Sequence, residues 1–123
     1  MARSSTEWAG NIGAFVRRDT DAKADNTAQK AALKSGAVLY AVRVNNASNA
    51  YDIYCKIYDD AAPTIGTTQP DAIFMVHASV DRTFLIPGGI TFTNNPSYSV
   101  SRSPGVTAGA DPGAAVTIDL IYS

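Results

Sequence analysis

The chain has 123 residues, of which 46% are hydrophobic and 17% are charged, and its formal net charge at pH 7 is −1. This length suits one domain with a single core, and the nearly balanced charge argues against a general nucleic-acid binder, which needs a basic excess. With one cysteine and one histidine, we expect neither an internal disulfide nor a histidine-based metal or catalytic site. No apolar run approaches the length of about 18 residues that a membrane span requires.

The first 33 residues differ in composition from the rest of the chain. They are rich in Ala, Asp, Asn, Thr and Lys, and they contain few large apolar residues. The large apolar residues that do occur are Trp8, Ile12, Phe15 and Val16, and their spacing of three and four residues fits a short helical turn. Gly residues interrupt this turn, and each costs about 1 kcal/mol inside a helix. We therefore predict an N-terminal arm over residues 1–33 that docks on its own body or contacts a partner through Trp8, Ile12, Phe15 and Val16.

Two arginines follow this apolar cluster directly. Arg17 and Arg18 could bind a phosphate group or an acidic protein surface. Asp19 and Asp21 dilute the local positive charge, so a solvated pair is the alternative interpretation. We include both arginines among the candidate contact residues of the arm.

From residue 36 onward, the apolar residues recur at every second position, which is typical of half-buried strands. Asn, Asp, Gly and Pro separate the runs and favour turns. No segment of the body has a helical period, which excludes alternating strands and helices. The pattern predicts an all-β domain over residues 34–123, an antiparallel β-sandwich resembling a jelly roll. The expected strands cover residues 38–44, 51–58, 73–77, 83–86, 90–93, 98–102 and 116–122.

Alternation also predicts which side chains share a face in the first two strands. Val42 and Cys55 fall on the faces expected to be inward, and Leu39, Tyr54 and Tyr58 fall on the opposite faces. Aromatic residues are ordinary in strands, so packing within the chain is one interpretation. The other is that Leu39, Tyr54 and Tyr58 form an apolar surface that another subunit covers.

The residues that could carry chemistry do not form a recognisable constellation. Asp59 and Asp60 lack the alternating oxygen ligands of a calcium loop, and the acids of the body lie at turns. His77 ends an apolar run without an evident partner, and Cys55 shares its face with other apolar residues. We therefore expect no catalytic residue, no metal, no cofactor and no small-molecule substrate.

The order of motifs in the body resembles that of a group of small β-sandwich virion proteins of tailed bacteriophages. The resemblance covers residues 34–123, with Ile57 where the group more often has leucine. It implies a structural role without catalytic residues. The matching segments are KSGAVLY (34–40), VNNASN (44–49), YCKIYDDAAPTIGTTQPD (54–71), FLIPGGITF (84–92) and VTIDLIY (116–122).

Two functions are compatible with this resemblance. The first is a capsid decoration, or cement, protein: a homotrimer on the virion surface that bridges subunits of the major capsid protein. The second is a tail-fibre or receptor-binding module whose distal loops contact a host glycan or protein. The long loops at 59–71 and 103–113 contain no aromatic residue, which favours the decoration protein. We expect no membrane and no direct nucleic-acid contact for either.

Overall fold

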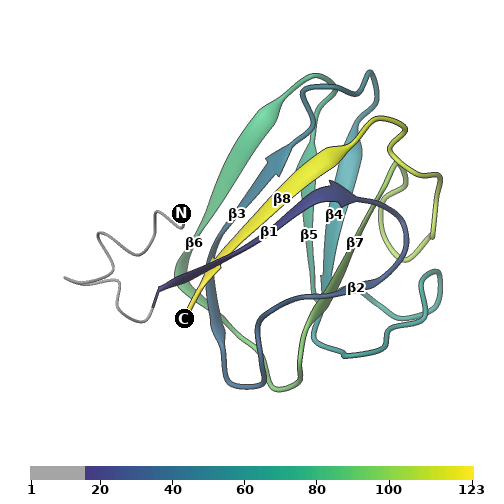
Figure 1. The fold of residues 1–123 in the computed structure, drawn as a ribbon. Helices are drawn as coiled ribbons and strands as arrows, with labels where there is room; N and C mark the ends of the chain where they lie inside the picture. The colour runs from purple at the N-terminus through teal and green to yellow at the C-terminus, as the bar shows by residue number, and fades with distance from the viewer. Residues whose placement is uncertain (1–15) are drawn as a thin grey trace.

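The computed structural model describes residues 16–123, and every regular element of this part is a β-strand. No described segment forms a helix that is long and apolar enough to cross a membrane. The strands form two antiparallel sheets that face each other, as Figure 1 shows. They are β1 (Arg17–Ala24), β2 (Gln29–Lys30), β3 (Val38–Asn45), β4 (Ile53–Tyr58), β5 (Ala72–Val76), β6 (Asp81–Thr91), β7 (Ser97–Ser101) and β8 (Val116–Tyr122).

The strand order is that of a jelly roll. The first sheet has the order β1-β8-β3-β6, and the second sheet has the order β2-β7-β4-β5. In both sheets the early strands pair with the late ones: β1 with β8, β2 with β7, β3 with β6 and β4 with β5. The described chain therefore resembles one long hairpin of four strand pairs that folds over to form two packed sheets. The predicted antiparallel β-sandwich is confirmed.

The core lies between the inner faces of the two sheets. Alternate residues of β4 and β8 are almost completely buried there, and Phe92 and Leu33 close the core from connecting segments. Cys55 is part of this core, and burial raises the pKa of its thiol to about 12. The predicted role of Cys55 in packing is therefore confirmed, since a buried thiol with this pKa is a poor nucleophile.

A β-bulge at Tyr40 changes the inward face of β3. Leu39 lies opposite Tyr122 of β8, whereas Ala41 lies opposite Ile121, so β3 holds one extra residue at this point. An extra residue reverses the alternation on one side of the bulge. Leu39 consequently points into the core and is fully buried, while Tyr40 is exposed. The sequence-based assignment of Leu39 to a partner-contact face is wrong for this reason.

The segment 17–33 belongs to the sandwich and does not form an arm. β1 pairs with β8 along its length, and β2 pairs with β7. Leu33 is buried in the core, and the Tyr98 hydroxyl of β7 donates a hydrogen bond to Asp21 of β1 at 2.8 Å, connecting the two sheets. The predicted boundary between residues 33 and 34 is therefore incorrect. Only residues 1–15, which lie outside the described residues, and Val16 precede the first strand.

We expect two N-terminal truncations to behave differently. A chain that begins at Val16 keeps every strand and should melt within about 8 °C of the full-length protein, the shift that about 1 kcal/mol produces in a small domain. A chain that begins at Lys34 lacks β1, β2 and the buried Leu33, and it should not unfold cooperatively. Thermal melting followed by circular dichroism tests both. Cooperative unfolding of the shorter chain would contradict the assignment of residues 17–33 to the sandwich.

Two adjacent glycines of β6 provide a second test of the fold. Gly88 and Gly89 both have positive φ angles, of 79° and 75°. A Cβ atom at Gly88 would meet nothing within 4 Å, whereas one at Gly89 would lie 2.3 Å from Cγ1 of Val38. Gly88→Ala should therefore cost about 1–2 kcal/mol for its backbone conformation, and Gly89→Ala about 1–3 kcal/mol more for steric overlap. Urea unfolding measures both values, and equal losses would contradict the close packing of β6 on β3.

Candidate interaction surfaces

The outer face of the second sheet is covered by loops of the same chain. The β4–β5 connection (59–71) and the β7–β8 connection (102–115) both lie on this side of the sandwich, as Figure 1 shows. The two connections touch each other where Gly66 lies against Ala108. Beneath them, Tyr58 is fully buried, and its hydroxyl lies 3.4 Å from Oγ of Ser99. The loops therefore cover the part of this face around Tyr58, while Ile73 of β5 remains 38% exposed at its edge.

Lys56 attaches one of these loops to the sheet. Its side chain extends from the outer face of β4, is only 1% exposed, and donates a hydrogen bond from Nζ to the carbonyl oxygen of Thr107 at 2.6 Å. Burial lowers the pKa of Lys56, because it removes water from the charged ammonium group. A buried lysine in the middle of the sheet thus holds the 102–115 loop in place.

The predicted contact surface of Leu39, Tyr54 and Tyr58 does not exist as an accessible face. Leu39 is in the core between the sheets, Tyr58 is buried beneath the loops, and Tyr54 is half-buried. The sequence pattern left open whether these residues pack within the chain or contact another subunit. It could not show that loops of the same chain provide the cover, because that depends on how the long connections fold back.

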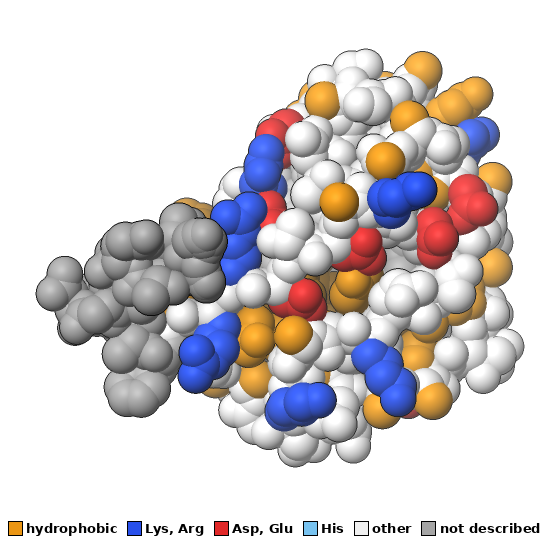
Figure 2. Space-filling model, in the orientation of Figure 1, with side chains coloured by type: hydrophobic (Ala, Val, Ile, Leu, Met, Phe, Trp, Pro, Cys, Tyr) orange, Lys and Arg blue, Asp and Glu red, His pale blue; other side chains and the backbone are white. Residues whose placement is uncertain are grey.

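The outer face of the first sheet is different, because a ladder of ion pairs crosses all four of its strands. Asp119 of β8 accepts from Arg18 of β1 at 3.0 Å and from Arg43 of β3 at 3.3 Å. Arg43 also makes two hydrogen bonds to Asp81 of β6, at 2.6 Å and 3.1 Å. In Figure 2, basic and acidic side chains alternate along this side of the molecule. The ladder ties β1 and β6, the two edge strands, to the centre of the sheet.

Asp119 is the centre of this ladder. Its side chain is only 3% exposed, and it also accepts a hydrogen bond from the Thr20 hydroxyl at 2.5 Å. Burial alone would raise the pKa of Asp119, but the hydrogen bonds from Arg18 and Thr20 and the arginine charges lower it below its usual value. Asp119 is therefore held ionised by partners from two neighbouring strands.

Next to the ladder, the same face carries an apolar row. Strand register places Ile121 of β8, Ala41 of β3 and Leu85 of β6 side by side, with Arg18 of β1 at the end of the row. None of the three apolar residues belongs to the core between the sheets. Leu85 is 78% exposed, more than any other large hydrophobic residue described. Ala41 is buried and Ile121 is half-buried, so Leu85 is the exposed end of this row. The face thus combines neutralised charges with one exposed apolar side chain, and we call it the open face.

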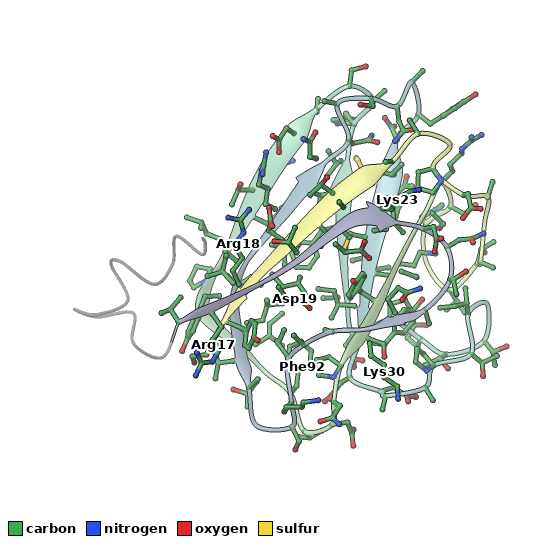
Figure 3. All side chains as sticks on the ribbon, in the orientation of Figure 1. Arg17, Arg18, Asp19, Lys23, Lys30 and Phe92 are labelled. Carbon is green, nitrogen blue, oxygen red and sulfur yellow. The ribbon has the colours of Figure 1, made fainter. Side chains whose placement is uncertain are left out.

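The candidate contact residues of the predicted arm fall into two groups. Trp8, Ile12 and Phe15 lie outside the described residues. Val16 is half-buried just before β1, and Arg17 and Arg18 lie on opposite sides of β1, as Figure 3 shows. Arg18 is paired with Asp119 within the chain, which matches neither the solvated pair nor the free phosphate-binding pair suggested by the sequence. Arg17 is exposed.

Two depressions in the described surface are open and lined by more polar than apolar surface. One of them has a volume of about 630 Å³ and lies beside Asp59. The Asp59 carboxylate already accepts hydrogen bonds from the backbones of Thr93 and Asn94. These hydrogen bonds outweigh burial and lower the pKa of Asp59. Among residues 16–123, no group of three or more His, Cys, Asp or Glu side chains is placed to hold a metal ion.

Comparison with protein-family models, with curated proteins and with solved structures finds no match to this chain. The class that the described residues define is a single jelly-roll β-sandwich with one outer sheet face partly covered by its own loops and the other face open. Any functional inference starts from these two faces.

The ion-pair ladder predicts a difference between two aspartates that share Arg43. Asp119→Asn should lower the free energy of unfolding at pH 7 by about 1.5–3 kcal/mol, because it weakens charge-assisted hydrogen bonds at a buried site. Asp81→Asn, at a side chain that is 38% exposed, should cost less than about 1 kcal/mol. Chemical denaturation of both variants measures these values.

The contribution of Asp119 to the free energy of unfolding should also depend on pH. Its pKa is lower in the folded chain than in the unfolded chain, where it is about 3.9, so its stabilisation is complete above the unfolded value. This stabilisation is lost as the pH falls through the pKa that Asp119 has in the folded chain. The stability difference between the wild type and Asp119→Asn should thus be constant from pH 7 to about pH 5 and shrink below about pH 4. A difference that persists in acid would contradict this account.

Proposed function

We propose that this chain is a structural protein of a bacteriophage virion, and specifically a capsid decoration protein that bridges subunits of the major capsid protein. The observation that carries the proposal is the asymmetry of the sandwich. One sheet face is largely covered by loops, while the open face presents the exposed Leu85 beside neutralised charges. Such a flat face suits contact with another protein better than it suits a small ligand, which binds in a concave pocket.

The sequence resemblance to small virion proteins supports the same proposal. Decoration requires no chemistry, and its stabilising effect comes from burying interface area at many symmetry-related positions. In a homotrimer, three open faces and three N-terminal segments would act together, and multivalent attachment makes weak individual contacts sufficient. In this proposal Trp8, Ile12 and Phe15 contact neighbouring capsid subunits, together with Val16 and Arg17.

The fold favours decoration over a tail-fibre or receptor-binding module. A receptor-binding module of this type would present its long connections at a distal end. Here the connections 59–71 and 102–115 lie against the second sheet, and Lys56 and Gly66 are among the residues that hold them there. The loops are therefore attached to the side of the sandwich and do not extend from its end.

The decisive measurement is the copy number of the chain in purified virions of the phage that encodes it. A decoration protein should be present in hundreds of copies, comparable to the major capsid protein, and quantitative mass spectrometry measures this ratio. A handful of copies per virion would place the chain in the tail and contradict the proposal.

Capsids stripped of the protein provide the second test. Full-length protein should rebind them, and the chain that begins at Val16 should rebind more weakly, because it lacks three large apolar side chains. Full burial of each is worth about 1.5–3 kcal/mol before the cost of ordering the segment. Equal binding of both chains would show that residues 1–15 are not part of the attachment, and the open face alone would be responsible.

A further inference from the structure

Strand β6 is an edge of the first sheet, because it pairs with β3 and with no other strand of the described chain (Figure 1). The amide of Asn46 donates a hydrogen bond to the carbonyl oxygen of Val80 at 2.8 Å. In an antiparallel ladder, hydrogen-bonded pairs alternate with pairs that are not bonded. Arg82 and Phe84 are therefore the next residues of β6 that bond to β3. The N–H and C=O groups of the residues between them point away from the sheet, into solvent: Asp81, Thr83 and Leu85.

The edge strands on the other side of the sandwich are protected from pairing with another chain. Asp19 and Asp21 of β1 are aligned with core residues of β8, so their carboxylates point between the sheets. β2 is only two residues long. Inward-pointing charges and very short strands are common means of preventing edge-to-edge association. The β1–β2 side of the sandwich is therefore a poor template for a further strand.

The β6 edge is more apolar. Phe84 and Ile86 pack against the core but are only half-buried. The guanidinium group of Arg82 lies over the Phe84 ring, 4.6 Å from its centroid. Free backbone groups next to exposed apolar side chains make an edge strand a template for pairing.

Phe84 also contacts the edge of the second sheet. Its ring centroid lies 5.1 Å from that of Phe74 in β5, the edge strand of that sheet. Phe74 is half-buried as well. The two rings thus lie between the sheets on the β5–β6 side and remain partly accessible in a single molecule. A strand that pairs with β6 would cover them further.

The β6 edge is complementary to itself when two copies pair in antiparallel fashion about Thr83. In this register Thr83 faces Thr83 of the second copy, and Asp81 faces Leu85. Each such pairing forms two backbone hydrogen bonds, so the contact contains about six. Arg82 faces Phe84 of the second copy, which favours a cation–aromatic contact. No two like charges lie opposite each other.

A register centred one residue further along the strand is less favourable. Pairing about Phe84 would place Asp81 opposite Pro87, which has no N–H group to donate. Beyond Pro87, Gly88 and Gly89 have positive φ angles, and the pairing with β3 is irregular. The usable edge is therefore the segment 81–86, and Thr83 lies near its centre.

We propose that two copies of this chain associate through β6, so that their first sheets form one continuous antiparallel sheet. Because both copies use the same edge, the contact closes at two chains. Backbone hydrogen bonds supply the affinity, as in other cases of strand addition. The proposal concerns the isolated protein and does not rest on the proposed role in a virion. The β6 contact is also separate from any contact that would hold a homotrimer.

The first experiment measures the oligomeric state of the full-length chain by sedimentation velocity over a series of concentrations. The wild type should form dimers as the concentration rises. Thr83→Pro removes the outward N–H group of residue 83 and no hydrogen bond to β3, so it should raise the dissociation constant of the dimer about tenfold or more. Thr83→Val is the matched control, because it keeps the N–H group and should leave the dissociation constant nearly unchanged.

A second experiment tests the register. Thr83→Lys and Thr83→Glu each place two like charges opposite each other in the proposed dimer, so each variant alone should dimerise about tenfold more weakly or worse. An equimolar mixture should recover dimers, because opposite charges then face each other. This recovery requires residue 83 of one copy to lie next to residue 83 of the other.

Circular dichroism melting verifies that each variant is folded, and the Thr83→Lys and Thr83→Glu pair tests the contact even if Thr83→Pro does not fold. A wild type that stays monomeric at every concentration would overturn the proposal. An oligomer that Thr83→Pro leaves unchanged would also overturn it, since another surface would then hold the chains together. Failure of the mixture to recover dimers would overturn the Thr83 register. None of these results depends on the copy number in virions, so failure here is distinct from failure of the proposed function.

Discussion

The bulge at Tyr40 is the constraint on which the first sheet depends. β3 lies between β8 and β6 and pairs with both of them near the bulge. Its register therefore sets which residues of the two neighbouring strands lie side by side. One extra residue sends Leu39 into the core, whereas Ala41 keeps the outward position set by its alternation with Val42. β6 holds more residues than β3 over the same interval, because Leu39 pairs with Ile90 whereas Ala41 pairs with Leu85. Gly89 lies in this interval, where a Cβ atom would overlap the Val38 side chain. Without the bulge, regular alternation would place Leu39 on the outer face and Tyr40 in the core.

The ladder and the apolar row both follow from this register. With Ala41 outward, Arg43 is also outward, and it reaches Asp119 on one neighbouring strand and Asp81 on the other. The same register aligns Leu85 and Ile121 on either side of Ala41. Charges that satisfy one another leave little net field across the face, so the apolar row becomes its most distinctive feature. This favours protein contact over the binding of a charged ligand such as nucleic acid.

The two faces of the sandwich solve the same problem in different ways. On the second sheet, a buried lysine and two long connections cover much of the outer face within one chain. On the first sheet, the outer face carries the ion pairs of Asp119 with Arg18 and Arg43, and Leu85 is exposed there. The proposed capsid attachment uses the outer face of the first sheet, because this face carries Leu85, the most exposed large hydrophobic residue described.

The sequence by itself determined the fold class, because period-two apolar runs separated by Asn, Gly and Pro leave few alternatives to antiparallel sheets. It also determined that Cys55 is a core residue, as its alternation with polar neighbours indicated. It did not determine which faces are inward in β3, or that residues 17–33 form strands. Those depend on pairings such as Arg18 with Asp119, which are about 100 residues apart, and on a bulge that reverses the alternation. Only the tertiary structure brings such distant residues together, and only it shows which surfaces stay uncovered.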